Sequence, residues 1–312
     1  MCKEDYKMIQ KIITIVLLVL IAGCTTGITQ NNIPNDFHTG TQGIVLNIVQ
    51  NAPPSKIYKG DHLTVSVELF NKGAYPASGN FQGKLEISGF DTSAINGAWD
   101  NGNEMPADLR GKSMYDPAGG YDIMSYDADS VSVPFNADSY PADLIVHSCY
   151  RYETQASPLV CIDPQPYEAV SEAKVCQVGD ISLSGGQGAP IAVTKIEEEV
   201  GADTIYFRIY IKNVGDGTVI NPLSYNNCPF DLKYEDLNKV TVNIRTSFDT
   251  GPRCTPAGTS SDPVNLIDGQ GVIFCSFRKP NSVSAYQTPL SIDVDYAYSS
   301  SVTKHFEIIN VN

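Results

Sequence analysis

The stretch LTVSVELFNKG at residues 63–73 alternates apolar and polar side chains and ends on Asn71 and Gly73. The stretch IYFRIYIKNVG at residues 205–215 repeats this pattern 142 positions later and ends on Asn213 and Gly215. An alternation of period two is typical of a strand with one buried face. Asn and Gly both accept the positive φ that many tight turns need. Each stretch therefore predicts a β-strand followed by a turn, and the pair predicts an internal repeat.

A second match lies near the end of each repeat. Apolar and tyrosine side chains alternate with polar ones at residues 144–152, and residues 290–298 show a matching pattern 146 positions later. We expect a short polar turn after each match and then a returning strand, at residues 159–162 and 304–311. The tyrosines are predicted to lie in the core with their hydroxyl groups on polar partners, and an exposed platform for sugars is the alternative. They are Tyr150, Tyr152, Tyr296 and Tyr298.

Short strands at hairpin spacing, with no sustained helical periodicity beyond the N-terminal segment, predict an all-β fold. Further strand candidates lie at residues 84–88 and 240–245. Because the matches keep their order, we expect two tandem Ig-like β-sandwich domains, at residues 43–165 and 179–312, with a linker at 166–178. The one helix candidate is YEAVSEAKV at residues 167–175, at this junction.

The N-terminal segment predicts export. Its apolar run at residues 12–22 is too short to span about 30 Å of hydrocarbon, so residues 1–23 fit a signal peptide. The run ends in LIAGC at residues 20–24, which resembles a lipobox, and this resemblance implies a lipid anchor on Cys24. A polar, flexible tether follows at residues 24–42. The predicted localisation is the extracytoplasmic face of the cell membrane, and an uncleaved anchor or a start at Met8 are alternatives.

The charge and the histidine content exclude several classes of function. Acidic residues outnumber basic ones by 35 to 21, which gives a net charge of −14 over 312 residues. A surface this acidic repels nucleic-acid backbones, so we expect no nucleic-acid partner. The four histidines form no recognisable metal-binding or catalytic motif. We therefore expect no enzymatic activity and no cofactor.

Six cysteines follow Cys24, and an even number in an exported chain predicts three disulfides. A turn that pairs residues 152 and 158 would place Cys149 opposite Cys161, and a Cys161–Cys176 bridge is the alternative. We expect Cys254–Cys275 to close a polar loop and Cys176–Cys228 to join the entry of the second domain to an insertion at residues 217–238. The cysteines are spaced too widely for a thiolate zinc site. The six are Cys149, Cys161, Cys176, Cys228, Cys254 and Cys275.

Residues 92–130 form a long segment rich in acidic residues and glycine. Oxygen-rich loops at the ends of sandwiches can bind calcium, although a solvated acidic loop is the simpler interpretation. The same segment carries Trp99, Met105, Met114 and Tyr115, which either form a binding surface or pack against the sandwich. The calcium candidates are Asp100, Asn103, Glu104, Asp127 and Asp129.

The strand that ends in NKG at residues 71–73, repeated as a strand that ends in NVG at 213–215, resembles the CARDB and NEW3 type of Ig-like domain. The segment LSGGQGAP at residues 183–190 resembles part of uncharacterised archaeal envelope proteins. This resemblance implies tandem, mostly non-enzymatic cell-surface modules. We therefore expect a membrane-anchored structural, adhesive or partner-binding ectodomain whose partner is another envelope or surface protein. It would hold the acidic segment or the 217–238 insertion away from the membrane. A ligand- or calcium-binding lipoprotein that uses residues 92–130 is the alternative.

Overall fold

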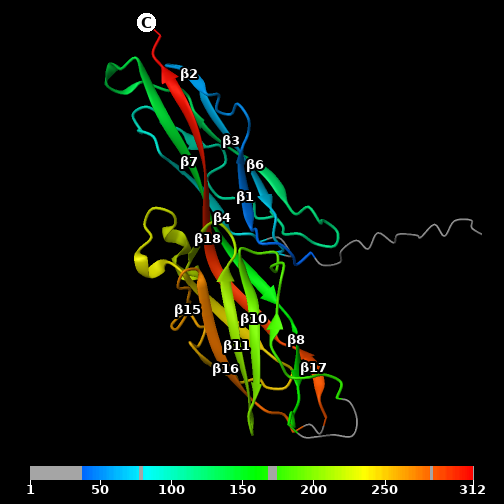
Figure 1. The fold of residues 1–312 in the computed structure, drawn as a ribbon. Helices are drawn as coiled ribbons and strands as arrows, with labels where there is room; N and C mark the ends of the chain where they lie inside the picture. The colour runs from blue at the N-terminus through cyan, green and yellow to red at the C-terminus, as the bar shows by residue number, and fades with distance from the viewer. Residues whose placement is uncertain (1–36, 77–79, 168–173, 282–283, 312) are drawn as a thin grey trace, which may run out of the picture. The chain divides into compact units, whose positions relative to one another are not determined.

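Two long antiparallel strands, β7 (Ser139–Ala156) and β18 (Ser291–Ile309), organise the fold (Figure 1). Their register is unbroken from Ala156 opposite Ile292 to Ser139 opposite Ile309. They contain the two sequence stretches in which tyrosines alternate with aliphatic residues. The prediction of strands at these two places is therefore confirmed.

The structure is a computed structural model that describes residues 37–76, 80–167, 174–281 and 284–311. The predicted signal peptide, Cys24 and residues 24–36 of the tether lie outside the described residues, and so do residues 168–173 of the helix candidate. The described residues belong to one compact unit and are mainly strands and loops, which confirms the all-β class. Their helical segments are three short 3₁₀ turns, η1 (Pro134–Asn136), η2 (Pro222–Asn227) and η3 (Tyr234–Asp236).

The two long strands form the centre of a seven-stranded sheet in which five strands have the order β15-β13-β18-β7-β4. Two further short strands, β12 and β2, also pair with β18, and β2 does so in parallel. The bounds of the five shorter strands in this sheet are β2 (Lys56–Tyr58), β4 (Gly83–Ser88), β12 (Thr218–Ile220), β13 (Lys239–Arg245) and β15 (Val264–Asn265).

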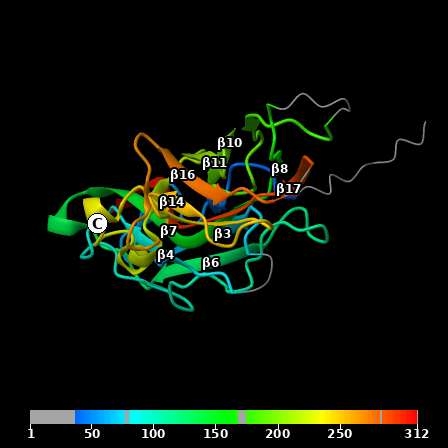
Figure 2. The same cartoon turned by 90° about the horizontal axis from the view of Figure 1, so that it is seen from below.

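Two further sheets flank the long pair. The four-stranded sheet has the order β1-β3-β6-β5, and the five-stranded sheet has the order β14-β16-β11-β10-β9. In Figure 1 the first lies beside the upper part of β7 and β18 and the second beside the lower part, and in Figure 2 their labels fall on opposite sides of β7. The four-stranded sheet contains β1 (Ile44–Ile48), β3 (Leu63–Asn71), β5 (Ala98–Trp99) and β6 (Tyr121–Ala128). The five-stranded sheet contains β9 (Ile181–Ser182), β10 (Ile191–Val200), β11 (Thr204–Asn213), β14 (Arg253–Thr255) and β16 (Gln270–Arg278).

The repeat seen in the sequence is a repeat in space. The strand of residues 63–71 is β3 and the strand of residues 204–213 is β11, and each is an inner strand of its own sheet. Along β3 every second residue is buried, as the period-two pattern predicts. The four tyrosines of β7 and β18 are at most 3% exposed, which confirms that they belong to the core.

Two predicted turns are wrong, because both long strands continue through them. After Tyr152, β7 runs on to Ala156. The inward-facing Thr154 is accommodated there because its buried hydroxyl donates a hydrogen bond to the Ile191 carbonyl at 2.8 Å. After Tyr298, β18 runs on to Ile309, since Ser300 is held to Ser148 across the sheet by a 2.8 Å hydroxyl contact. Residues 304–309 are therefore the end of β18 and not a separate returning strand.

The strand predicted at residues 159–162 is confirmed as β8 (Leu159–Ile162), but its predicted partner is wrong. It pairs with β17 (Tyr286–Pro289) in a two-stranded sheet rather than folding back on β7. The division into two domains at residues 166–178 stays a prediction. The strand pairing adds a feature that the repeat alone did not indicate, which is that β7 and β18 are common to both halves.

Candidate binding surface

The insertion at residues 217–238 lies on the outward face of the seven-stranded sheet. It begins with β12, which pairs with β18, and continues through η2 and η3. The Cys149–Cys228 disulfide joins it to β7, with 6.0 Å between the two Cα atoms. Cys149 lies on this face because its side chain alternates with the inward Tyr150. The insertion is thus fixed covalently to the strand pair that both halves share.

A small apolar cluster lies beneath the insertion, separate from the main core. Its fully buried members are Cys149, Ile220, Cys228 and Ala297. Tyr225, Leu232 and Leu237 pack against them. Burial of this size stabilises by roughly 1.5–3 kcal/mol for each large side chain that it removes from water. The cluster and the disulfide together hold the insertion in one place.

Local hydrogen bonds fix the path of the insertion. The Asn221 side chain accepts from the Leu223 backbone N–H at 3.0 Å and caps η2. The Ser224 hydroxyl donates to Asp236 at 2.6 Å, and the Lys233 backbone N–H donates to the same carboxylate at 2.9 Å. These two hydrogen bonds lower the pKa of Asp236, and the bond from Ser224 has the larger effect. The insertion is therefore an ordered loop whose ends and middle are tied together.

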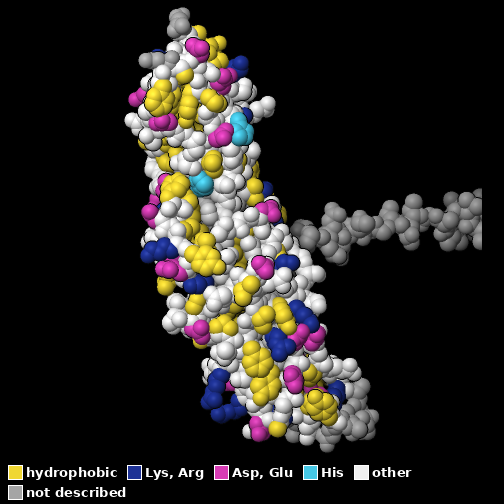
Figure 3. Space-filling model, turned by 60° about the vertical axis from the view of Figure 1, so that its left-hand side comes forward, with side chains coloured by type: hydrophobic (Ala, Val, Ile, Leu, Met, Phe, Trp, Pro, Cys, Tyr) yellow, Lys and Arg dark blue, Asp and Glu magenta, His cyan; other side chains and the backbone are white. Residues whose placement is uncertain are grey.

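Three large apolar side chains of the insertion face solvent, with exposed fractions of 69% for Leu223, 59% for Phe230 and 91% for Tyr234. The Phe230 ring makes an edge-on contact with His147 at 5.6 Å between centroids. Burial lowers the pKa of His147 and so favours the neutral form of this neighbour. Figure 3 shows hydrophobic side chains among charged ones along the face that it draws. Exposed apolar groups on a rigid loop are typical of a binding surface.

Lys84 of β4 supplies the cation at the edge of this surface. Its ammonium donates to the Asn226 carbonyl at 3.2 Å and lies 6.0 Å from the centre of the Tyr225 ring. It is also 4.0 Å from the Glu86 carboxylate. The surface is thus apolar with a charged rim, which is the usual composition of a protein interface.

The cysteines pair as Cys149–Cys228, Cys161–Cys176 and Cys254–Cys275. The prediction for Cys254–Cys275 and the alternative Cys161–Cys176 are confirmed. The predictions of Cys149 opposite Cys161 and of Cys176–Cys228 are wrong, because β7 makes no hairpin with β8 and the outward Cys149 faces the insertion.

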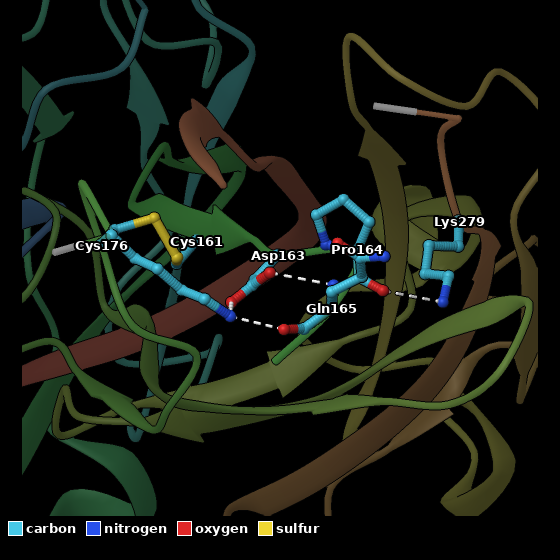
Figure 4. Close-up of polar contacts among 7 residues, drawn as sticks. Cys161, Asp163, Pro164, Gln165, Cys176 and Lys279 are labelled. Atoms are coloured by element: carbon cyan, nitrogen blue, oxygen red, sulfur yellow. Dashed lines mark hydrogen bonds and ion pairs between the residues drawn. A yellow bond between two sulfur atoms is a disulfide. The ribbon is translucent and has the colours of Figure 1, made fainter. Parts of the chain in front are cut away.

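The Cys161–Cys176 bridge is reinforced by charged and polar contacts two residues further in. The Lys174 ammonium lies 2.7 Å from the Asp163 carboxylate, whose side chain is 5% exposed. The same carboxylate accepts from the Gln165 backbone N–H at 2.9 Å, and Lys279 donates to the Pro164 carbonyl at 3.0 Å (Figure 4). Buried charges persist in folded proteins when they are paired in this way. These contacts hold the strand end at residue 162 in place.

Glu198 of β10 was not singled out by the sequence. It occupies an inward position and is 8% exposed, and neither carboxylate oxygen has a hydrogen-bond partner in the described part of the chain. Burial raises its pKa to about 7, and the nearby Cys161 backbone amide opposes the shift without completing a hydrogen bond. The run EEE at residues 197–199 hides this position, since period-two alternation places one of the three inside.

The calcium candidates of residues 92–130 do not converge on one site. Asp127 and Asp100 share a hydrogen bond, but Asp127 also accepts from Thr64 at 2.5 Å. Asn103 instead donates to Glu86 at 2.7 Å, and Glu104 lies in a bridge to Lys84. Asp129 is exposed. Within the described ranges, no group of three or more His, Cys, Asp or Glu side chains could hold a metal ion.

The acidic segment is also not one loop, because β5 and β6 lie within it and pair with each other, and β6 also pairs with β3. Of its large apolar side chains, Met105 is buried and Trp99 packs edge-on against Tyr126 at 5.6 Å. Met114 and Tyr115 are 58% and 91% exposed. Tyr121 and Ile123 of β6 are exposed as well, so the segment packs partly on the sandwich and leaves two apolar pairs in solvent.

No protein-family model matches the sequence, and no curated protein matches it. Among solved structures, the chain is similar to the crystal structure of the CupB6 tip adhesin from Pseudomonas aeruginosa, with 10% sequence identity and a TM-score of 0.18. The similarity covers 87% of this chain and 96% of that chain. At this TM-score the similarity carries no argument about function. The resemblance to CARDB and NEW3 domains stays a prediction.

Among the described residues, no helix is long and apolar enough to cross a membrane.

Proposed function

We propose that the chain is a non-enzymatic, extracytoplasmic protein that is anchored to the cell membrane and binds another envelope or surface protein through its 217–238 insertion. The observation that carries the proposal is the exposed pair Phe230 and Tyr234 on a loop fixed by the Cys149–Cys228 disulfide. A rigid loop loses little conformational entropy on binding, and aromatic side chains contribute most to interface energies. The three disulfides also support an oxidising compartment outside the cytoplasm.

Photo-crosslinking in intact envelopes tests the proposed surface. A photoreactive phenylalanine analogue placed at position 234 is expected to yield a crosslinked partner that mass spectrometry identifies. The matched control carries the same analogue at Tyr115, which is also 91% exposed but lies in the acidic segment. A partner crosslinked from position 115 and none from position 234 would contradict the proposed surface.

Intact-mass analysis of protein purified from membranes tests the anchor. The expected species begins at Cys24 and carries the added mass of a lipid. A soluble, unmodified species that retains Met1 would show that the anchor assignment is wrong. Within the described residues the calcium alternative has no support, since Asp127 accepts from Thr64, the Asn103 amide donates to Glu86, and no group of three or more His, Cys, Asp or Glu side chains could hold a metal ion.

A further inference from the structure

One edge of β18 is open in the middle of the strand. The other edge is bonded to β7 along the whole strand. On the open side, β13 and β12 pair with residues up to Ser299, and β2 pairs from Glu307 onward. Between Ser300 and Phe306, no strand of the described chain pairs on this side. The gap therefore lies in line between β12 and β2.

The direction of the backbone groups in the gap follows from the register. The Arg151 N–H donates to the Gln82 carbonyl. The backbone N–H and C=O groups of the odd-numbered residues of β7 therefore point toward β4, and those of the even-numbered residues point toward β18. In β18 the even-numbered residues consequently bond to β7. The odd-numbered ones point to the other side, as the bond from the Glu307 N–H to the Ser55 carbonyl shows.

Three residues thus present unpaired backbone groups in the gap. The N–H and C=O groups of Ser301, Thr303 and His305 point to the open side, and no backbone group of a described residue bonds them. All three residues are exposed. This is a ready template for an added strand.

Several end strands of the sheets are very short, whereas the end strands β1 and β4 have five and six residues. The end strands β5, β9 and β15 have two residues each, and β14 has three residues and a disulfide to β16. Very short edge strands prevent unwanted pairing. The gap in β18 has no proline and no irregularity of register, so it lacks two of the usual protections.

Side chains around the gap indicate what an added strand would carry. A cleft of about 470 Å³ adjoins the gap and is lined by Leu46 of β1 and by Ser300 and Ser301. Val302 and Lys304 are half-buried on the inward face of β18, and Lys304 makes no ion pair with another described residue. One inward-facing residue of an added strand would cover Val302 and Leu46. The next inward-facing residue, two positions along the added strand, would meet the Lys304 ammonium.

We propose that residues 300–306 of β18 bind an extended peptide of a partner protein by strand addition. The peptide has an acidic residue that faces Lys304, and apolar residues two positions to either side of it. Backbone bonds to Ser301, Thr303 and His305 supply the pairing, and Lys304 both selects the acidic residue and disfavours apolar strands. The site is separate from the insertion surface and does not rest on the function proposed for it.

The test uses the full chain and the labelled heptapeptide Thr-Val-Thr-Glu-Thr-Val-Thr, with a central Lys in place of Glu as the comparison peptide. Hydrogen exchange of the amides at residues 301, 303 and 305 is expected to slow at least tenfold with the Glu peptide. Binding measured by fluorescence anisotropy is expected to be at least tenfold weaker for the Lys peptide. An absence of protection with the Glu peptide at millimolar concentration would overturn the proposal.

Two variants make the test specific. Thr303→Pro removes an N–H that does not bond to β7, so the fold is expected to persist while peptide binding falls at least tenfold. Lys304→Glu is expected to reverse the preference between the two peptides, which a merely structural role of Lys304 would not do. Equal binding by Thr303→Pro and the parent chain would overturn strand addition. Protection that rises with protein concentration alone would make the occupant a second copy and overturn the partner assignment.

Discussion

At the scale of single residues, one polar unit occurs twice and explains the sequence motif. The Tyr152 hydroxyl donates to the Asn71 side chain at 2.9 Å, and the Tyr298 hydroxyl donates to Asn213 at 3.0 Å. Each hydroxyl also accepts a backbone N–H of the loop that follows the asparagine, from Tyr75 at 3.4 Å and from Gly217 at 2.7 Å. The two matches found in the sequence are thus the two ends of one buried hydrogen-bonded unit.

The glycine of the motif is required for a reason that the sequence did not indicate. A Cβ at Gly73 would lie 2.0 Å from the Tyr152 hydroxyl, and one at Gly215 would lie 2.6 Å from the Tyr298 hydroxyl. Neither glycine has a positive φ, so the prediction of a left-handed turn residue is wrong. Composition and period identify the motif, but only the packing of β3 or β11 on the long strands shows the close approach.

Removal of one tyrosine hydroxyl tests this unit. Tyr152→Phe leaves the buried Asn71 oxygen and the Tyr75 N–H each without one partner, so we expect a loss of about 1–3 kcal/mol in the free energy of unfolding. Tyr298→Phe is expected to behave alike. Urea unfolding measures both, with Tyr58→Phe as the control because Tyr58 is 52% exposed. A loss no greater than that of the control would show that the hydroxyls contribute little.

Glu198 predicts a pH dependence of stability. The folded-state pKa of about 7 lies above the unfolded value of about 4.5, so the folded chain holds a proton that the unfolded chain releases between these pH values. Below pH 4.5 this residue contributes no pH dependence. As the pH rises from 4.5 to 7, the stability of the folded state falls, by about 3 kcal/mol in total.

The variant Glu198→Gln is expected to abolish this decrease. The free energy of unfolding of the variant, minus that of the parent chain, should be roughly 3 kcal/mol larger at pH 8 than at pH 4. Urea unfolding at both pH values measures it. Glu199→Gln, at the exposed neighbouring position, is the matched control and should show no such change. The same difference at both pH values would contradict a buried, neutral Glu198.

At the scale of elements, the strand prediction succeeds where one face of a strand is buried and the other face is exposed to solvent. The bounds of β4, β8 and β13 agree with the predicted runs within one residue at each end. It fails where polar residues such as Thr154 and Ser300 face inward, because cross-strand and backbone hydrogen bonds replace apolar burial there. The pairing of Cys149 with Cys228 depends on which segments lie beside β7. The local alternation of apolar and polar residues cannot predict this contact, because the two cysteines are 79 residues apart.

The disulfide of the insertion allows a prediction about that element. Cys149→Ser with Cys228→Ser removes a bridge that spans 79 residues, so we expect a loss of roughly 4 kcal/mol in unfolding free energy. The matched control, Cys161→Ser with Cys176→Ser, opens a 15-residue span and is expected to cost about 3 kcal/mol. Protease cleavage should increase within residues 217–238 only in the first variant. Unchanged cleavage there would mean that the apolar cluster alone holds the insertion.

At the scale of the whole molecule, the two halves share strands. Tyr150 and Tyr152 of β7 contact Ile44 and Tyr75 of the first half, whereas Tyr296 of β18 accepts from Ile191 of the second. Thr154 of β7 donates to the backbone carbonyl of the same residue, Ile191. The repeat predicts two sandwiches, but the two sequence matches could not show that β18 also pairs with β2 of the first repeat or that β7 also bonds to Ile191 of the second.

The shared strands predict that neither half folds alone. A chain of residues 179–312 keeps β18 but lacks β7, so it exposes the β18 edge and the buried faces of Tyr296 and Tyr298. We expect this half to lack a cooperative thermal transition, and residues 37–165 to behave likewise without β18. Refolding the two halves together under oxidising conditions should restore one cooperative transition, because the β7–β18 ladder and the Cys149–Cys228 bridge can then form. Circular dichroism melting measures each case. A cooperative transition in residues 179–312 alone would establish an independent second domain and contradict the dependence of one half on the other.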